Sequence, residues 1–100
     1  MTIRHVVSWK LATAVPGERA EQSAAIKRGL ESLPASIPEI LALEVGVNAL
    51  NPDANFDVVL ISDFADADAI ARYVAHPEHE KVAAYIRSVV SGRSAVDFEV

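Results

Sequence analysis

The segment at residues 56–64 is apolar on both sides of an extended strand, because it contains the run Val58-Val59-Leu60-Ile61. Successive side chains of a strand point to opposite faces of a sheet, so a strand of this kind has to be covered on both faces. The loop before it, residues 48–55, is rich in turn residues and too short for a crossover helix. We therefore expect this strand to run antiparallel to the preceding one, at about residues 39–48.

The rest of the chain switches between strand and helix periodicity, and turn residues mark each change. Two further strands are predicted at residues 3–11 and 94–100. Helices are predicted from Pro16-Gly17 to before Pro34, from a cap at Asp66 to His76, and from Pro77 to a close at Gly92. The resulting order, β-α-β-β-α-α-β, is typical of an α+β, ferredoxin-like fold with an antiparallel four-stranded sheet and helices on one face.

A chain of 100 residues with 51% hydrophobic content fits one domain, residues 1–100, with a single core. Helices on one face leave the other apolar face of the sheet open, and an open apolar face is an interaction surface. A second copy related by a two-fold axis is the simplest cover. We therefore predict a homodimer through the sheet faces, which forms a shared α/β barrel.

Composition excludes several classes of partner. The net charge is -5, and the nine Lys and Arg residues are scattered, so we expect no nucleic acid and no membrane as a partner. Arg4 and Lys10 interrupt any apolar core of a signal peptide, and no stretch approaches the ~18 apolar residues of a membrane span. With no cysteine there is no disulfide and no thiolate nucleophile. We expect a cytoplasmic protein.

The three histidines are candidates for a proton-transfer site, provided that the fold brings His5 close to His76 and His79. His5 is on the first predicted strand, whereas His76 and His79 share the phrase His76-Pro77-Glu78-His79, three residues after Tyr73. An imidazole exchanges protons near neutral pH. Because Pro77 breaks the helix between the two histidines, His76, His79 and Glu80 are not expected to bind a metal. No nucleophile motif and no phosphate-binding loop is present, so no cofactor is expected.

Each of these residues also has a structural interpretation. His76, before Pro77, is expected to cap a helix break. His79 lies in the first turn of a helix, where a neutral imidazole is favoured, and is either a base or simply exposed. His5 and Tyr73 are either catalytic groups or satisfied core residues. Asp57 either pairs with a histidine or begins its strand at the solvent edge, and we favour the edge.

Four segments together resemble the stress-responsive dimeric α/β-barrel (Dabb) family: residues 3–11, residues 55–60, the phrase from Tyr73 to His79, and Val96-Asp97-Phe98. The resemblance implies the dimeric barrel. One member is a plant polyketide cyclase, in which a histidine is the general base and a tyrosine polarises a carbonyl. Carried over, these roles fall on His79 and Tyr73, with His5 lining the same pocket. The chain departs from that cyclase at two positions. The cyclase has a histidine in place of Asp57 and a tyrosine in place of about Ile26.

Two functions remain open. The first is a cofactor-independent cyclase, isomerase or lyase that uses His79 and Tyr73, with His5, for proton transfer on a small apolar carbonyl compound. The second is a non-catalytic dimer that acts in a stress response or binds a small hydrophobic ligand. An apolar cavity that reaches both His5 and His79, with Tyr73 oriented into it, would favour the enzyme.

Overall fold

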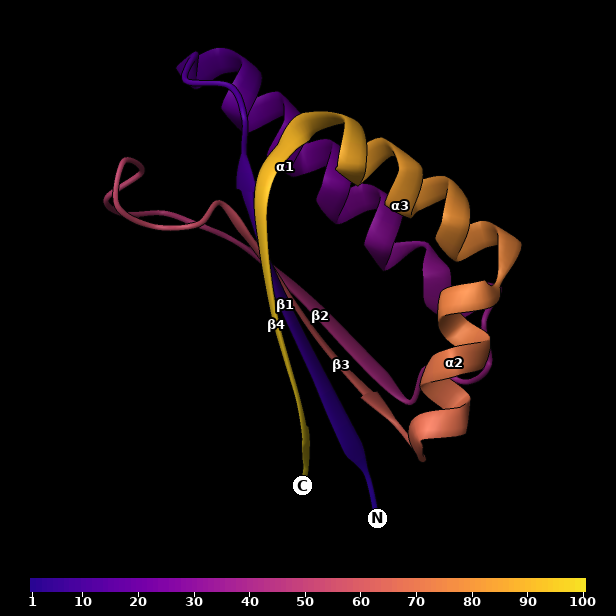
Figure 1. Ribbon diagram of the computed structural model, residues 1–100. Helices are drawn as coiled ribbons and strands as arrows, with labels where there is room; N and C mark the ends of the chain where they lie inside the picture. The colour runs from indigo at the N-terminus through magenta and orange to yellow at the C-terminus, as the bar shows by residue number, and fades with distance from the viewer.

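The computed structural model describes residues 1–100 and consists of one antiparallel sheet with helices on a single face (Figure 1). The elements are β1 (Ile3–Leu11), α1 (Pro16–Glu31), a 3₁₀ turn (Leu33–Ala35), β2 (Ala42–Val47), β3 (Val58–Phe64), α2 (Ala67–Ala75), α3 (Pro77–Val89) and β4 (Val90–Glu99). The sheet has the order β2-β3-β1-β4. The predicted order of elements and the ferredoxin-like α+β fold are confirmed. None of the helices combines the length and the apolar character needed to cross a membrane.

The core lies between the sheet and the helices. Every second residue of β1, from His5 to Leu11, is buried on the helix side. Val58 and Leu60 of β3 are buried on the same side, and α1 packs Ile26 and Leu30 against them. Figure 1 shows α1 and α3 side by side over this face, with α2 at one end of the sheet.

The opposite face of the sheet has no helix over it (Figure 1). On this face β3 presents Val59 and Ile61, which confirms that the strand is apolar on both sides. On the other side of β1, Val96 and Phe98 of β4 are 61% and 43% exposed. We refer to this surface as the open face. An apolar surface of this extent on a small domain is typical of an interaction site.

One ion pair lies on the open face. Arg4 donates from Nε and Nη2 to the two carboxylate oxygens of Asp63, at 2.9 and 3.1 Å. The two residues are direct partners across β1 and β3. A bidentate pair of this kind satisfies both charged groups within the chain. Covering this pair would therefore bury no unpaired charge, whereas Glu44, opposite Ile61 on β2, is an exposed carboxylate of the same face that is in no ion pair.

The predicted end of α3 at Gly92 is wrong. The helix ends at Val89 and Val90 already has extended backbone, so β4 is longer than the predicted strand at residues 94–100. The cause is pairing with β1: Ala12 N–H donates to Val89 O at 2.9 Å, and Gly92 lies opposite Lys10 within the sheet. Pairing with a central strand thus overrides the helix-ending signal of the glycine.

Strand β2 begins at Ala42, later than the predicted start near Glu39. The residues before it form successive turns, in which Ile37 N–H donates to Leu33 O at 2.9 Å and Ile40 N–H donates to Ile37 O at 3.2 Å. These bonds hold the chain away from the sheet until residue 41.

The prediction that Asp57 begins its strand at the solvent edge is wrong, and its side chain pairs with no histidine. Asp57 is only 3% exposed and lies just before β3. Its carboxylate accepts a hydrogen bond from Leu11 N–H at 2.8 Å. Arg19 Nε and Lys10 Nζ lie 3.6 and 3.9 Å from its two oxygens. This buried carboxylate therefore joins β1, α1 and the start of β3.

Replacing Asp57 with alanine should lower the free energy of unfolding by about 1–3 kcal/mol, because Leu11 N–H and the two cations lose their acceptor in a buried place. Equilibrium urea unfolding measures the change. Asp53→Ala is the matched control, since Asp53 is exposed in the loop just before Asp57, and its effect should stay within about 0.5 kcal/mol. Equal effects of the two substitutions would show that Asp57 does not stabilise this junction.

Candidate functional site

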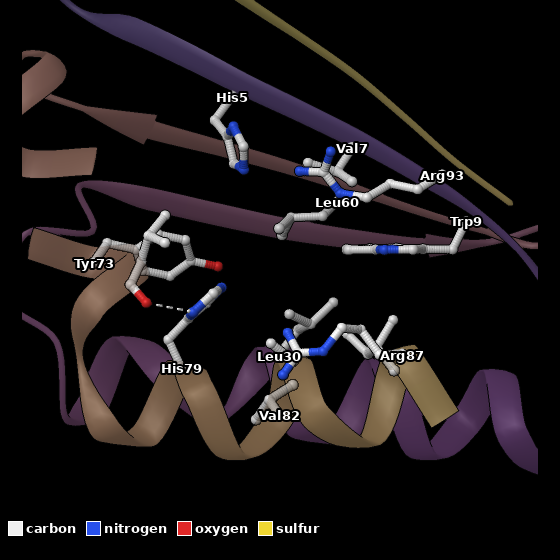
Figure 2. A pocket seen from close by; sticks show the side chains of 13 residues that line it. His5, Val7, Trp9, Leu30, Leu60, Tyr73, His79, Val82, Arg87 and Arg93 are labelled. Carbon is white, nitrogen blue, oxygen red and sulfur yellow. Dashed lines mark hydrogen bonds between the residues drawn. The ribbon is translucent and has the colours of Figure 1, made fainter. Parts of the chain in front are cut away.

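A cavity of about 220 Å³ lies between the sheet and the helices α2 and α3 (Figure 2). This volume is below the roughly 300–1,000 Å³ of pockets for drug-sized molecules, so the cavity suits a small ligand. Nine of its 13 lining residues are hydrophobic. The lining consists of His5, Val7, Trp9, Leu30, Leu60, Tyr73, Val74, His79, Val82, Ala83, Ile86, Arg87 and Arg93.

The break between α2 and α3 positions Tyr73 and His79. His76 has the extended backbone that a residue before proline prefers, and α3 begins at Pro77. The Nδ1 atom of His76 accepts a hydrogen bond from Glu78 N–H at 3.1 Å, which confirms its capping role. The break changes the direction of the chain, so that α3 leads away from α2 alongside α1 (Figure 1), and the rings of Tyr73 and His79 lie with their centroids 4.4 Å apart.

His79 is half-buried and its tautomer is fixed by the backbone. Its Nδ1–H donates to Val74 O at 3.0 Å, because a carbonyl oxygen can only accept. The proton is therefore on Nδ1, and the unprotonated Nε2 is directed toward the cavity (Figure 2). Burial is the largest cause and lowers the pKa of His79. The hydrogen bond to Val74 O opposes it, His5 and Arg87 lower the pKa further by smaller amounts, and Glu80 has the smallest, raising effect. At neutral pH, His79 is an uncharged base.

Tyr73 is 1% exposed and packs against Phe64, with ring centroids 4.9 Å apart. Its hydroxyl points into the cavity (Figure 2) and forms no hydrogen bond with another residue of the chain. Burial raises the pKa of Tyr73 to about 12. The hydroxyl therefore stays protonated at neutral pH and is free to donate a hydrogen bond to a ligand.

His5 approaches the same cavity from the sheet. Its ring centroid is 6.3 Å from that of Tyr73. Its Nδ1 is hydrogen-bonded to Oδ1 of Asp97, the residue directly opposite it on β4. A carboxylate at Nδ1 favours a proton on that atom. In Figure 2 the second nitrogen, Nε2, is directed toward the cavity.

Sequence reasoning missed Asp97 as a site residue, although it lies in the predicted strand at residues 94–100, between the apolar Val96 and Phe98. Strand alternation places Asp97 on the opposite face, toward the helices. Register with β1 could then have paired it with His5. The signal was present, but it required the strand pairing and not only the periodicity.

Arg87 and Arg93 are two further lining residues that the sequence analysis did not identify. Arg87 lies eight residues after His79 on α3, which is on the same helix face. Arg93 lies opposite Trp9 in the pairing of β1 with β4. Both positions follow from helical or strand spacing once the inward face is known.

The structure thus brings three predicted residues, His5, Tyr73 and His79, to one cavity and leaves His76 and Asp57 outside its lining. No group of three His, Asp or Glu side chains lies close enough to hold a metal ion. The lining offers bases and hydrogen-bond donors but no carboxylate. Chemically, the site can accept a proton at His79 and stabilise a developing oxyanion at Tyr73.

Comparison with known proteins places this fold and site in context. No protein of curated function matches the chain. A dimeric protein of unknown function with a ferredoxin-like fold, from Bacteroides fragilis, is 33% identical over 99% of this chain and 96% of its own, with a TM-score of 0.90. A dimeric ferredoxin-like protein of unknown function from Thermobifida fusca is 29% identical over 100% of this chain and 92% of its own, with a TM-score of 0.82.

The same fold occurs in an enzyme. SnoaB, a cofactor-independent oxygenase from Streptomyces nogalater, has a TM-score of 0.67 and 18% identity over 99% of this chain and 92% of its own. At this identity the likeness extends to the fold alone. The model of the stress responsive A/B barrel domain, Dabb, matches residues 3–100. The chain therefore belongs to the Dabb family, as its sequence motifs indicated.

Proposed function

We propose that the protein is a cofactor-independent acid–base catalyst that moves a proton at a carbon next to the carbonyl group of a small compound. The observation that carries this proposal is the orientation of His79, whose Nδ1–H is held by Val74 O while Nε2 is directed toward an apolar cavity. A base in such a cavity works without competition from bulk water.

In the proposed reaction, His79 Nε2 takes a proton from the carbon next to the carbonyl group. This produces an enolate and an imidazolium. The Tyr73 hydroxyl, which has no other partner, donates a hydrogen bond to the enolate oxygen as its charge develops. If the substrate is conjugated, return of the proton from the imidazolium to the far carbon of the dienolate is an isomerisation. If the enolate carbon attacks a second carbonyl of the same molecule, a ring closes and the new alkoxide takes the proton from the imidazolium, which is a cyclisation.

His5 is proposed to assist from the opposite wall of the cavity. Asp97 orients its ring so that Nε2 faces the cavity, where it can form a hydrogen bond with a polar group of the substrate. With His79 neutral and His5 held by a carboxylate, the two histidines have different environments and are suited to different tasks. Differences of this kind often separate an acid from a base in enzymes.

A non-catalytic binding protein is the alternative function, since most of the cavity lining is hydrophobic. Such a protein needs the apolar walls but not the tautomer of His79 or the free hydroxyl of Tyr73. Substitutions at these two residues therefore distinguish the two functions.

We further propose that the chain forms a homodimer through its open face. The relatives from Bacteroides fragilis and Thermobifida fusca are described as dimeric. The open face offers the apolar Val59, Ile61, Val96 and Phe98, and its charged pair of Arg4 and Asp63 is already satisfied within the chain. Two such faces packed together would form the α/β barrel.

Wild-type protein should accelerate exchange of the acidic C–H protons of small enolisable carbonyl compounds with D₂O, followed by loss of their ¹H NMR signals. His79→Gln should slow the exchange about 100-fold or more, because it removes the base. Tyr73→Phe should slow it about 100-fold, because the enolate loses its donor.

His76→Asn is the matched control for this assay, since it removes an imidazole and retains a side-chain acceptor for the cap of α3. Its exchange rate should equal that of the wild type. If wild-type protein exchanges no member of the panel, or if His76→Asn is impaired as strongly as His79→Gln, the non-catalytic function is favoured.

The ¹⁵N NMR titration of the histidines should give a midpoint for His79 below 6.5, because burial lowers the pKa of that ring. Its neutral form should carry the proton on Nδ1. Since the pKa in the unfolded chain is higher, the contribution of neutral His79 to stability should be lost as pH falls below about 6.5. A midpoint above 6.5, or a proton on Nε2 in the neutral ring, would contradict the proposed role as base.

Val96→Asp should shift the protein from dimer to monomer in size-exclusion chromatography with light scattering, because a charge would be buried between two sheets. Val15→Asp is the control, since Val15 is similarly exposed, at 52%, but lies before α1 and outside the sheet. A monomeric wild type, or a dimer that persists in Val96→Asp, would exclude the open face as the interface.

A further inference from the structure

We infer that the ligand of this cavity carries a carboxylate or a similar anionic group, held by Arg87 and Arg93. This inference rests on the proposed function, because it concerns the substrate of the same cavity. It narrows the class of substrate from carbonyl compounds in general to small keto acids.

The charge of the cavity differs in sign from that of the whole chain. The protein has 14 acidic and nine basic residues and a net charge of -5. The lining nevertheless contains two arginines and two histidines and no acidic residue. Asp97, the nearest carboxylate to His5, is already engaged by that histidine. An excess of basic over acidic side chains in the lining of this cavity favours an anionic ligand.

Both arginines lack a partner within the chain. None of the ion pairs in the structure includes Arg87 or Arg93. Several other basic residues on the helices, although not the exposed Arg28, do have partners: Arg72 Nε lies 3.0 Å from Glu39 and Lys81 Nζ lies 3.0 Å from Glu78. The guanidinium groups at the cavity therefore keep all their hydrogen-bond donors available for a ligand.

The two guanidinium groups approach the cavity from opposite layers. Arg93 reaches in from β4 on the sheet side, and Arg87 lies along α3 on the helix side (Figure 2). Their backbones lie at the Trp9 end of the cavity, whereas Tyr73 and His79 lie at the other end. Planar guanidinium groups bind carboxylates with two parallel hydrogen bonds. A ligand held in this way would have its anionic group between the arginines and its carbonyl group near Tyr73.

Position also matters for the chemistry. Arg87 is close enough to His79 to disfavour the charged form of that imidazole. A bound anion would offset this effect and favour the imidazolium that forms when His79 accepts a proton. The arginines would therefore orient the substrate and also support the proton transfer itself.

The test uses a series of small oxo acids, from 2-oxo to 6-oxo, in which the separation between the carboxylate and the carbonyl group increases, each paired with its neutral methyl ester, and isothermal titration with the protein. At least one acid should bind about tenfold more tightly than its ester, as expected for a charge-assisted contact. Arg87→Gln and Arg93→Gln should each reduce this preference without changing the affinity for the ester. Arg28→Gln, at an exposed position on α1 outside the cavity, should retain it.

The inference is overturned if no acid binds better than its ester, or if the preference survives both cavity substitutions. Proton exchange in D₂O, measured on the same compounds, separates the two proposals. If exchange depends on His79 but is equal for acid and ester, the acid–base function is supported and the binding of an anionic group is contradicted. If the acids bind more tightly in a way that depends on the arginines but no compound exchanges its protons, the anion site is supported and the catalytic function is contradicted.

Discussion

The central position of β1 is the constraint on which the rest of the structure depends. β1 pairs with β3 on one side and with β4 on the other, so its register fixes both neighbours. Its inward residues supply one wall of the cavity, and its outward residues belong to the open face. The pairing of His5 with Asp97 and the extension of β4 back to Val90 both follow from this register. The central strand β1 thus determines where α3, the helix before β4, must end.

The second constraint is the proline break between α2 and α3. A continuous helix could not bring Tyr73 and His79 together over one cavity, because residues six apart point in different directions on a helix. The break at Pro77 and the cap at His76 start a new helix in a different direction, so that His79 can face Tyr73. His76, which lies outside the cavity lining, therefore positions His79, which lies in it.

The fold could be predicted because it depends on local patterns. Alternation in β1 and β3, the cap at Asp66 and the break at Pro77 each act within a few residues, and each was found in the structure. The position of Asp57 could not be predicted in this way, since its partners come from two elements distant in the sequence, β1 and α1. The same holds for Asp97 and Arg93, which only the pairing of strands brings to the site. What sequence periodicity lacks is the register between distant segments.

The alternation of β4 has a consequence for how such a protein can evolve. Arg93 and Asp97 point toward the helices, while Val96 and Phe98 point to the open face. Single substitutions can change one surface and leave the other intact, so ligand preference and self-association can diverge independently. An insertion of one residue has the opposite outcome, because it exchanges the two faces at once. It would place charges on the apolar surface and apolar side chains in the cavity, so lineages of this protein should tolerate substitutions in β4 far better than changes in its length.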